Sequence, residues 1–406
     1  MVEGPGASSG PGPRVLFIAT YPADMAPGQR YRFEQYFSAI RRTGGKVRLS
    51  PFYSRRAYRI MHGPGRLASK IAMTLWGFAR RLRDLVRARF YDAVFIYREV
   101  SPVNLYDLEA ALLAVARYSL YDFDDSIWIQ NTSDANRAFR FLKSGDKVSR
   151  IIARADRTLV ANSYLEAYAR KEGGRVHIMP TSIDATTYHR GIDYRTTSPL
   201  TVGWTGSNTT LQYLVSLTPV LGRVFDRVPF KLRVVGGSEI DLTTRIPVEL
   251  VYWTSEREVA DLLPMYVGIN PMPVVLWTQG KSSLKAMQYM ALGIPTICVR
   301  YDFSEALIRD GESGLLAGGD AEWEEALVRL LSDAPMRERI GRNGRETIQS
   351  EFTNTVHEER FLKHLRAEEV PPLIIGRDRG DSHDSQASTP KEPYNAISSR
   401  SPDRRS

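Results

Sequence analysis

The sequence predicts an α/β fold with two Rossmann-like domains, each built on an open parallel sheet. Short, nearly continuous apolar runs recur along the chain, and helical stretches separate them. Such runs are typical of strands buried on both faces of a parallel sheet, and their alternation with helices indicates βαβ units. The pattern breaks once, over the polar segment Tyr188–Pro199, and then restarts. A chain of 406 residues is long enough for two such domains.

Each apolar run defines one expected strand. Before the break, the expected strands are Arg14–Thr20, Val47–Pro51, Ala93–Tyr97, Ser119–Phe123, Thr158–Ala161 and Val176–Met179. After the break, they are Leu200–Trp204, Lys231–Val235, Glu249–Trp253, Val267–Asn270, Thr296–Val299 and Gly314–Leu316. A last helix is expected at about Asn354–Glu368. We therefore predict a leader at 1–13, domains at 14–190 and 191–352, a C-terminal helix at 353–369 and a tail at 370–406.

The leader and the tail are predicted to be disordered. The leader is rich in Gly, Pro and Ser and lacks the apolar core of a signal peptide. The tail after Pro371 and Pro372 is polar, with few residues that could form a core.

Composition narrows the function classes. Hydrophobic residues make up 43% of the chain and charged residues 25%, which excludes a wholly disordered or collagen-like protein. The single cysteine, Cys298, excludes an intrachain disulfide or a multi-thiolate metal site and suits a reducing cytoplasm. No apolar run approaches the ~18 residues of a membrane-spanning helix, and no histidine pair has metal-binding spacing. The net charge of +9 favours anionic partners.

Candidate site residues in the first domain follow its strands, because open parallel sheets bind ligands at the carboxyl ends of their strands. After the first strand, Gly28 allows close backbone approach, and Arg30 and Arg32 add positive charge at an expected helix start. The strand Ser119–Phe123 runs into three carboxylates, Asp122, Asp124 and Asp125. These carboxylates could act as a base, hold a metal or contact sugar hydroxyls, or they could simply cap a helix.

The second domain offers two further candidate segments. Gly206, Ser207 and Thr209 follow its first strand, where they suit either a phosphate cradle or a plain capped turn. In the segment Thr278–Pro295, Lys281 and Ser282 lie at an expected helix start, where a cation and free N–H groups would both attract an anion.

Several segments together resemble the family 4 (group 1) glycosyltransferases, retaining enzymes of the GT-B fold. The resemblance runs from about Val15 to Phe361. The residues that carry it are Val176–Asp184, Trp253–Pro273, Lys281–Pro295, Glu305–Leu316 and Ile340–Arg345. The resemblance implies a nucleotide-sugar donor on the C-terminal domain, an acceptor on the N-terminal domain and a reaction in the cleft between them. It also implies that no metal or other cofactor is needed and that the last helix crosses back onto the first domain.

The sequence departs from the family pattern at its charged positions. The usual Glu-x7-Glu pair reads Gly280 and Gln288, so Gln288 is expected to hold the donor ribose without charge. The family's Arg and Lys pair is absent, and Asp124 stands where the family often has a histidine. The predicted catalytic residues are Asp124, Asp125 and Lys281. The predicted donor-binding residues are Gly28, Arg30, Arg32, Gly206, Ser207, Thr209, Lys281, Ser282 and Gln288.

Residues 67–89 are predicted to form a basic amphipathic helix. Its apolar positions recur at helical spacing and are Leu67, Ile71, Leu75, Phe78, Leu82 and Leu85. We expect this stripe to pack against the first domain. We expect the arginines Arg80, Arg81, Arg83, Arg87 and Arg89 to face an anionic membrane or acceptor.

The function predicted from these features is transfer of a sugar from a nucleotide sugar to a cell-envelope glycan or a lipid-linked acceptor. The expected place is the cytoplasm, at the inner face of the cell membrane. Two alternatives stay open. The absence of both family glutamates, at Gly280 and Gln288, favours a catalytically weak or inactive binding protein of the GT-B fold. The same fold could also belong to a nucleotide-sugar epimerase. Nucleic-acid binding explains the positive charge but not the helix starts, so no nucleic-acid partner is expected.

Overall fold

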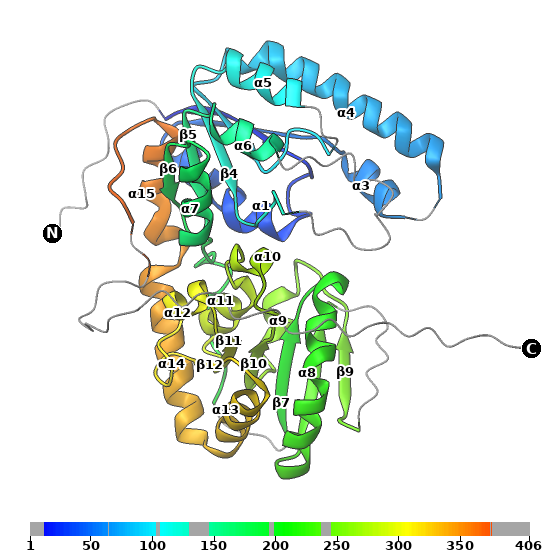
Figure 1. The fold of residues 1–406 in the computed structure, drawn as a ribbon, viewed down its shortest axis with the longest axis vertical. Coiled ribbons are helices and arrows are strands. Elements are labelled where there is room, and N and C mark those ends of the chain that lie inside the picture. Colours follow the sequence, from blue (N-terminus) through cyan, green and yellow to red (C-terminus); the bar gives the residue numbers. More distant parts are fainter. Residues whose placement is uncertain are drawn as a thin grey trace, which may run out of the picture. The chain divides into compact units, whose positions relative to one another are not determined.

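The protein folds around two six-stranded sheets in which every strand pair is parallel. The computed structural model describes residues 12–63, 65–102, 106–129, 146–194, 199–236, 245–373 and 375. The first sheet has the order β2-β1-β3-β4-β5-β6 and the second the order β12-β11-β10-β7-β8-β9. Figure 1 shows the strands with the helices around them. Each of the twelve expected strands is present, and the predicted fold class is confirmed.

The strands are short, and those inside the two sheets are more deeply buried than the edge strands β2 and β9. Those of the first sheet are β1 (Arg14–Ala19), β2 (Lys46–Pro51), β3 (Ala93–Tyr97), β4 (Ser119–Phe123), β5 (Arg157–Val160) and β6 (Val176–Ile178). Those of the second are β7 (Leu200–Thr205), β8 (Phe230–Val235), β9 (Val248–Val251), β10 (Val267–Asn270), β11 (Thr296–Val299) and β12 (Leu315–Ala317). Every residue of β3 and β4 is buried, as expected for strands covered by helices on both faces.

Helices connect successive strands in both sheets. In the first domain they are α1 (Pro27–Arg32), α2 (Phe37–Arg42), α3 (Arg55–His62), α4 (Leu67–Ala88), α5 (Tyr106–Val115), α6 (Asp146–Ile152) and α7 (Ser163–Lys171). A short 3-10 helix, η1 (Glu34–Tyr36), separates α1 from α2. In the second domain they are α8 (Asn208–Arg227), α9 (Glu258–Leu262), α10 (Leu276–Gln279), α11 (Leu284–Ala291), α12 (Asp302–Leu307), α13 (Asp320–Ser332) and α14 (Ala334–Glu351).

The last helix, α15 (Asn354–Leu365), follows the second domain but packs on the first. The Phe361 ring stacks on Tyr36 of η1 at 4.3 Å between centroids. Arg42 at the end of α2 forms an ion pair with Glu358 at 2.6 Å. Beside β5, the Nη1 atom of Arg157 lies 3.0 Å from Nδ1 of His364. These contacts join the C-terminal end of the chain to the first sheet.

Some residues of the predicted disordered leader and tail contact the folded domains. Gly12 donates its N–H to the Thr43 carbonyl at 2.9 Å, so the first domain begins before residue 14. At the other end, Val370 is buried and Leu373 packs against the core. Leader positions 1–11 and tail positions 374 and 376–406 lie outside the described residues.

The orientation of α4 corrects the expected packing stripe. This helix buries a small and polar face made of Gly77, Arg81, Asp84 and Ala88. A Cβ atom at Gly77 would lie 2.4 Å from the Phe52 ring, so glycine allows the helix to approach the domain closely. The predicted apolar stripe instead points largely to solvent: the exposed members are Leu67, Ile71, Leu75 and Leu82. Phe78 and Leu85 alone in this set pack against the core clusters.

The arginines of α4 divide into buried and exposed groups. The Arg81 guanidinium is fully buried, pairs with Asp84 at 2.9 Å and donates to the Val100 carbonyl. Arg80 donates to the Phe52 carbonyl at 3.2 Å. The expectation that these two arginines face a membrane is therefore wrong, because each fixes α4 to the domain. Arg83 and Arg89 are exposed.

Candidate active site

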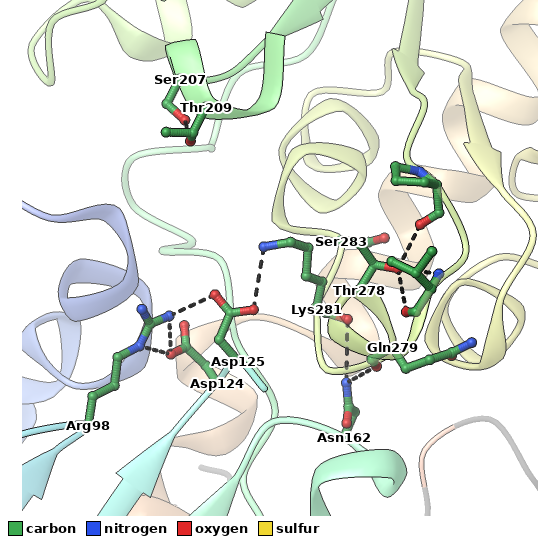
Figure 2. Close-up of polar contacts among 12 residues, drawn as sticks. Arg98, Asp124, Asp125, Asn162, Ser207, Thr209, Thr278, Gln279, Lys281 and Ser283 are labelled. Carbon is green, nitrogen blue, oxygen red and sulfur yellow. Dashed lines mark hydrogen bonds and ion pairs between the residues drawn. The ribbon is translucent and has the colours of Figure 1, made fainter. Parts of the chain in front are cut away.

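Two carboxylates and an arginine meet at the carboxyl end of the first sheet. Asp124 and Asp125 follow β4, and Arg98 follows the neighbouring strand β3. The Arg98 Nε atom donates to Asp124 Oδ1 at 2.8 Å, and its Nη2 atom lies 3.3 Å from Asp125 Oδ2 (Figure 2). Tyr97 donates its hydroxyl to the same Asp124 oxygen at 2.8 Å. Arg98 has a φ of 58°, an uncommon backbone conformation for a non-glycine residue, and such conformations cluster at functional sites.

Asp124 is held in its charged form. Burial favours the neutral acid, but the nearby Arg98 and Arg32 guanidiniums and the hydrogen bonds from Arg98 and Tyr97 outweigh it. The pKa of Asp124 therefore lies below its ordinary value. This group is an anion and a hydrogen-bond acceptor at neutral pH, rather than a proton donor.

Lys281 reaches this cluster from the second domain. Its Nζ atom lies 3.4 Å from Asp125 Oδ1 and 3.9 Å from the centroid of the Trp277 ring. The side chain of Asn162 donates to the carbonyl of Gln279 at 3.2 Å, which fixes the loop before α11 against the first domain (Figure 2). The structure thus brings together all three predicted catalytic residues, Asp124, Asp125 and Lys281.

Gly280 shows why the first glutamate of the family pattern is absent. A Cβ atom at this position would lie 2.3 Å from Ser126 Oγ and 2.8 Å from the Ser126 backbone nitrogen. The loop that carries Asp124 and Asp125 therefore occupies the space beside residue 280, and a larger side chain does not fit there.

Gln288 belongs to a buried network that also joins the two domains. Its Nε2 atom lies 2.7 Å from Glu258 Oε1, 2.7 Å from the Tyr188 hydroxyl and 3.0 Å from the Tyr31 hydroxyl. Arg30 of α1 pairs with the same Glu258 at 2.9 Å. The Gln288 amide nitrogen is thus occupied by protein groups, and Glu258 provides the carboxylate that position 288 itself lacks.

Gly28 and Arg32 lie close in sequence but differ in environment. A Cβ atom at Gly28 would lie 2.2 Å from the Tyr97 hydroxyl oxygen and 3.3 Å from Asp124 Oδ2, so the α1 backbone borders the carboxylate cluster. The Arg32 side chain is fully buried and pairs with Asp122. The prediction that Arg32 binds the donor is therefore wrong, because its charge is used inside the first domain.

The remaining donor-binding candidates lie at the starts of two helices. A Cβ atom at Gly206 would lie 2.6 Å from the Trp204 ring. Ser207 and Thr209, at the start of α8, are exposed, with hydroxyl oxygens 2.8 Å apart. Figure 2 shows this pair apart from the contact between Asp125 and Lys281. Ser282, before α11, is buried.

Sequence reasoning missed Arg98 and Glu258. Arg98 directly follows a predicted strand, so the rule that selected Asp124 also selects it. Glu258 lies in a segment without a chemical motif, and only the tertiary structure connects it to Gln288. Within the described residues, no cluster of His, Cys, Asp or Glu could hold a metal ion. No helix in this part of the chain combines the length and apolarity required to span a bilayer.

Comparison with known proteins supports the resemblance. Residues 199–333, within the second domain, match the family model described as Glycosyl transferases group 1. The lipopolysaccharide core biosynthesis glycosyltransferase LpsE of Rhizobium meliloti is 30% identical over 81 residues. That match covers 20% of this chain and 24% of LpsE, so the chain spans about a quarter of this relative.

Solved structures extend the likeness to the whole fold. Sucrose-phosphate synthase from Thermosynechococcus elongatus superposes with a TM-score of 0.63 at 17% identity, covering 87% of this chain and 98% of that one. HepE from Anabaena, solved in complex with UDP-glucose, gives a TM-score of 0.60 at 13% identity, covering 87% and 100%. The predicted resemblance and the GT-B fold are confirmed.

Proposed function

We propose that the protein is a glycosyltransferase that moves a sugar from a nucleoside-diphosphate sugar to a cell-envelope glycan or a lipid-linked acceptor. The observation that carries this proposal is the meeting of Asp124 and Asp125 with Lys281 across the two domains. The group 1 domain, the likeness to LpsE and the UDP-glucose complex of HepE support a nucleotide-sugar donor and an envelope acceptor.

The proposed chemistry uses opposite charges on the two sides of the breaking bond. The carboxylates of Asp124 and Asp125 stabilise positive charge on the transferred sugar or accept hydrogen bonds from its hydroxyls. The Lys281 ammonium and the N–H groups at the start of α11 stabilise the negative charge that grows on the departing diphosphate. This arrangement requires no metal ion, and we assign it the retaining outcome of the family that the chain resembles.

We further propose that the protein attaches to the inner face of the cell membrane through α3 and α4. The exposed apolar side chains on and just after α4 are Leu67, Ile71, Leu75, Trp76, Leu82, Val86 and Phe90. Exposed arginines lie on the same two helices, at Arg55, Arg56, Arg59 and Arg83. Apolar side chains beside cations fit an anionic lipid surface, where a lipid-linked acceptor would also lie.

A two-part assay tests the activity. Thermal stabilisation by UDP, GDP, ADP and TDP identifies the donor base, and radiolabelled sugars on that base are then offered with bacterial lipid extracts. We expect label in the lipid or glycan fraction and its loss in Asp125→Asn. Nucleotide binding without transfer or epimerisation would favour the inactive binding protein. A change in the sugar's configuration without transfer would favour the epimerase.

A further inference from the structure

We propose that a basic cavity between α7, β6 and α15 binds a phosphate group, at a site separate from the candidate active site. Its lining comes from these three elements and from the segment after α15, and its basic members are Arg170, Arg175, His177 and Arg360 (Figure 1). The cavity volume is about 230 Å³, several times the ~30 Å³ of one water molecule, so an ion of several atoms fits. This inference does not depend on sugar transfer.

Positive charge gathers at the amino ends of β5 and β6. Arg157 is the first residue of β5, and Arg175 directly precedes β6. The Arg170 guanidinium donates to the carbonyl of Val176, the first residue of β6, at 3.3 Å. The carboxylates of the candidate active site instead follow the carboxyl end of the parallel strand β4. These arginines and the candidate active site therefore lie toward opposite ends of the first sheet.

The cavity carries more positive charge than its own carboxylate balances. Arg170 pairs with Glu166 at 2.7 Å. Within the described residues, no acidic side chain forms an ion pair with Arg175, Arg360 or the neighbouring Arg157, whose guanidinium donates to a backbone carbonyl instead. Guanidiniums without carboxylate partners are available to an anion, and their planar fork matches the oxygens of phosphate.

Two donors beside this charge are buried and unsatisfied. Among the described residues, Nη1 of Arg360 and Nε2 of His364 have no hydrogen-bond partner. His364 is fully buried, and its Nδ1 atom accepts from Arg157 at 3.0 Å, so Nε2 carries the proton. Buried donors without a partner are rare in folded proteins, and a bound ion is one way of satisfying them.

The environment of His177 confirms that the cavity favours negative charge. Burial and the guanidiniums around it lower the pKa of His177, while Glu369 acts in the opposite direction. The guanidiniums responsible are those of Arg157, Arg170 and Arg360. The same cations that disfavour a proton on this imidazole attract an anion to it.

An ion in the cavity would bridge elements that are distant in sequence. Arg175 precedes the edge strand β6, whereas Arg360 belongs to α15, which follows the second domain. A phosphate bound to both would hold α15 to the first sheet, so its binding should stabilise the folded protein. A free phosphate ester and a lipid headgroup offer the same chemistry.

Thermal melting of the full chain tests the inference, with inorganic phosphate as the probe and sodium chloride at equal ionic strength as the reference. Phosphate at about ten times its Kd should raise the melting temperature by roughly 2–4 °C. The rise should disappear in Arg360→Met and shrink in Arg175→Met, whose exposed position leaves the core intact. Arg190→Met, an exposed arginine outside the cavity, should keep the full rise.

Lys281→Met separates this cavity from the candidate active site, where phosphate can also bind, and should keep the rise. No rise in the parent, a full rise in both Arg360→Met and Arg175→Met, or its loss in Lys281→Met would overturn the inference. None of these outcomes bears on the proposed function, which sugar transfer tests.

Two further probes identify the source of the phosphate group. Glucose 6-phosphate is compared with glucose in solution, and vesicles with phosphatidic acid are compared with vesicles of phosphatidylcholine. The natural source should bind the parent at least ~10-fold more tightly than Arg360→Met. If parent and variant bound both probes equally, the cavity would not be a phosphate site.

Discussion

The Lys281 ammonium lies between the Asp125 carboxylate and the Trp277 ring, at the start of α11. If it stabilises the departing diphosphate, its effect is larger in the transition state than in the ground state. Lys281→Ala should therefore lower kcat by ~10²-fold or more while raising the donor KM less. Steady-state kinetics with the identified donor measure both values. Lys171→Ala, an exposed lysine on α7, is the control, and transfer at the parent rate in Lys281→Ala would show that the side chain has no catalytic part.

The two aspartates should differ in their response to neutralisation. Asp124 accepts hydrogen bonds from Tyr97 and Arg98. Asp124→Asn therefore removes a charge and also disturbs the contact between the ends of β3 and β4. Asp125 contacts Arg98 and Lys281 by charge, so Asp125→Asn leaves more of the local structure intact. We expect both variants to lose at least ~10²-fold in kcat, with a larger fall in melting temperature for Asp124→Asn. Parent turnover in both would reduce the pair to a structural role.

The sequence predicted which residues lie at the ends of strands. It did not predict which charged residues form ion pairs with residues distant in the sequence. Asp124, Asp125 and Lys281 follow strands or precede a helix, and such positions are fixed by local pattern. Arg32 occupies an equally promising position, but its partner Asp122 is 90 residues away in sequence. No local pattern reveals that pairing, because it depends on how β1 and β4 are placed in the sheet.

Helix α4 shows the same limit at the scale of an element. Periodicity predicted its length to within one residue, yet assigned the wrong face to the core. The buried face carries Gly77 and the Arg81–Asp84 pair, and Arg81 donates to the Ala19 carbonyl of β1. Hydrophobic periodicity cannot identify a polar pair that faces the core. It therefore predicts burial for the apolar face of α4, which is exposed.

The exposed apolar face of α4 predicts lipid binding that depends on two side chains. Leu75 and Trp76 are 64% and 66% exposed. The Leu75→Ser, Trp76→Ser double variant should lose at least ~10-fold in binding to anionic vesicles, because burial of each apolar side chain is worth roughly 1.5–3 kcal/mol. Flotation with anionic and neutral vesicles, at low and high salt, measures it. Val215→Ser on α8 is the matched control, and binding indifferent to lipid charge and salt would contradict the assignment.

Helix α15 should make stability depend on acid pH through two buried histidines. Burial lowers the pKa of His357 from 6.5 to about 4 and that of His364 from 6.5 to about 2. The unfolded chain therefore binds these protons more tightly, so stability is complete above about pH 6.5 and falls as the pH drops toward 4. Melting temperatures at pH 7.5 and 5 should differ less in His364→Gln than in the parent. His189→Gln, at an exposed position, should keep the parent difference.

At the scale of the whole molecule, the contacts between the domains hold the candidate site together. Among the contacts that cross between them are those of Lys281 with Asp125, Gln288 with Tyr31, and Gly280 against Ser126. Each uses a residue of the α11 segment in which the chain departs from the family's glutamate pattern. The crowding concerns the first departure alone, because the loop after β4 approaches too closely for a side chain at position 280.

This close approach predicts that a larger residue at position 280 will impair transfer and spare donor binding. In Gly280→Ala the new Cβ would meet the Ser126 backbone nitrogen at 2.8 Å as well as its hydroxyl at 2.3 Å, so the loop after β4 must move away. That movement separates Asp125 from Lys281, and misplacement by about 1 Å can cost ~10²-fold in rate. We expect kcat to fall by at least ~10-fold in Gly280→Ala and further in Gly280→Glu.

Donor binding distinguishes this effect from general damage. The proposed diphosphate contacts, Lys281 and the N–H groups at the start of α11, belong to the second domain, so the nucleotide Kd should stay within about threefold in both variants. Gly222→Ala, in α8 with open space around the new Cβ, is the control and should change neither value. Ser126→Gly removes the hydroxyl from the contact and should restore part of the rate to Gly280→Ala, but not to Gly280→Glu. If Gly280→Glu transferred sugar at or above the parent rate, the loop after β4 would not occupy this space during turnover. Contact between the domains would then not require glycine at position 280.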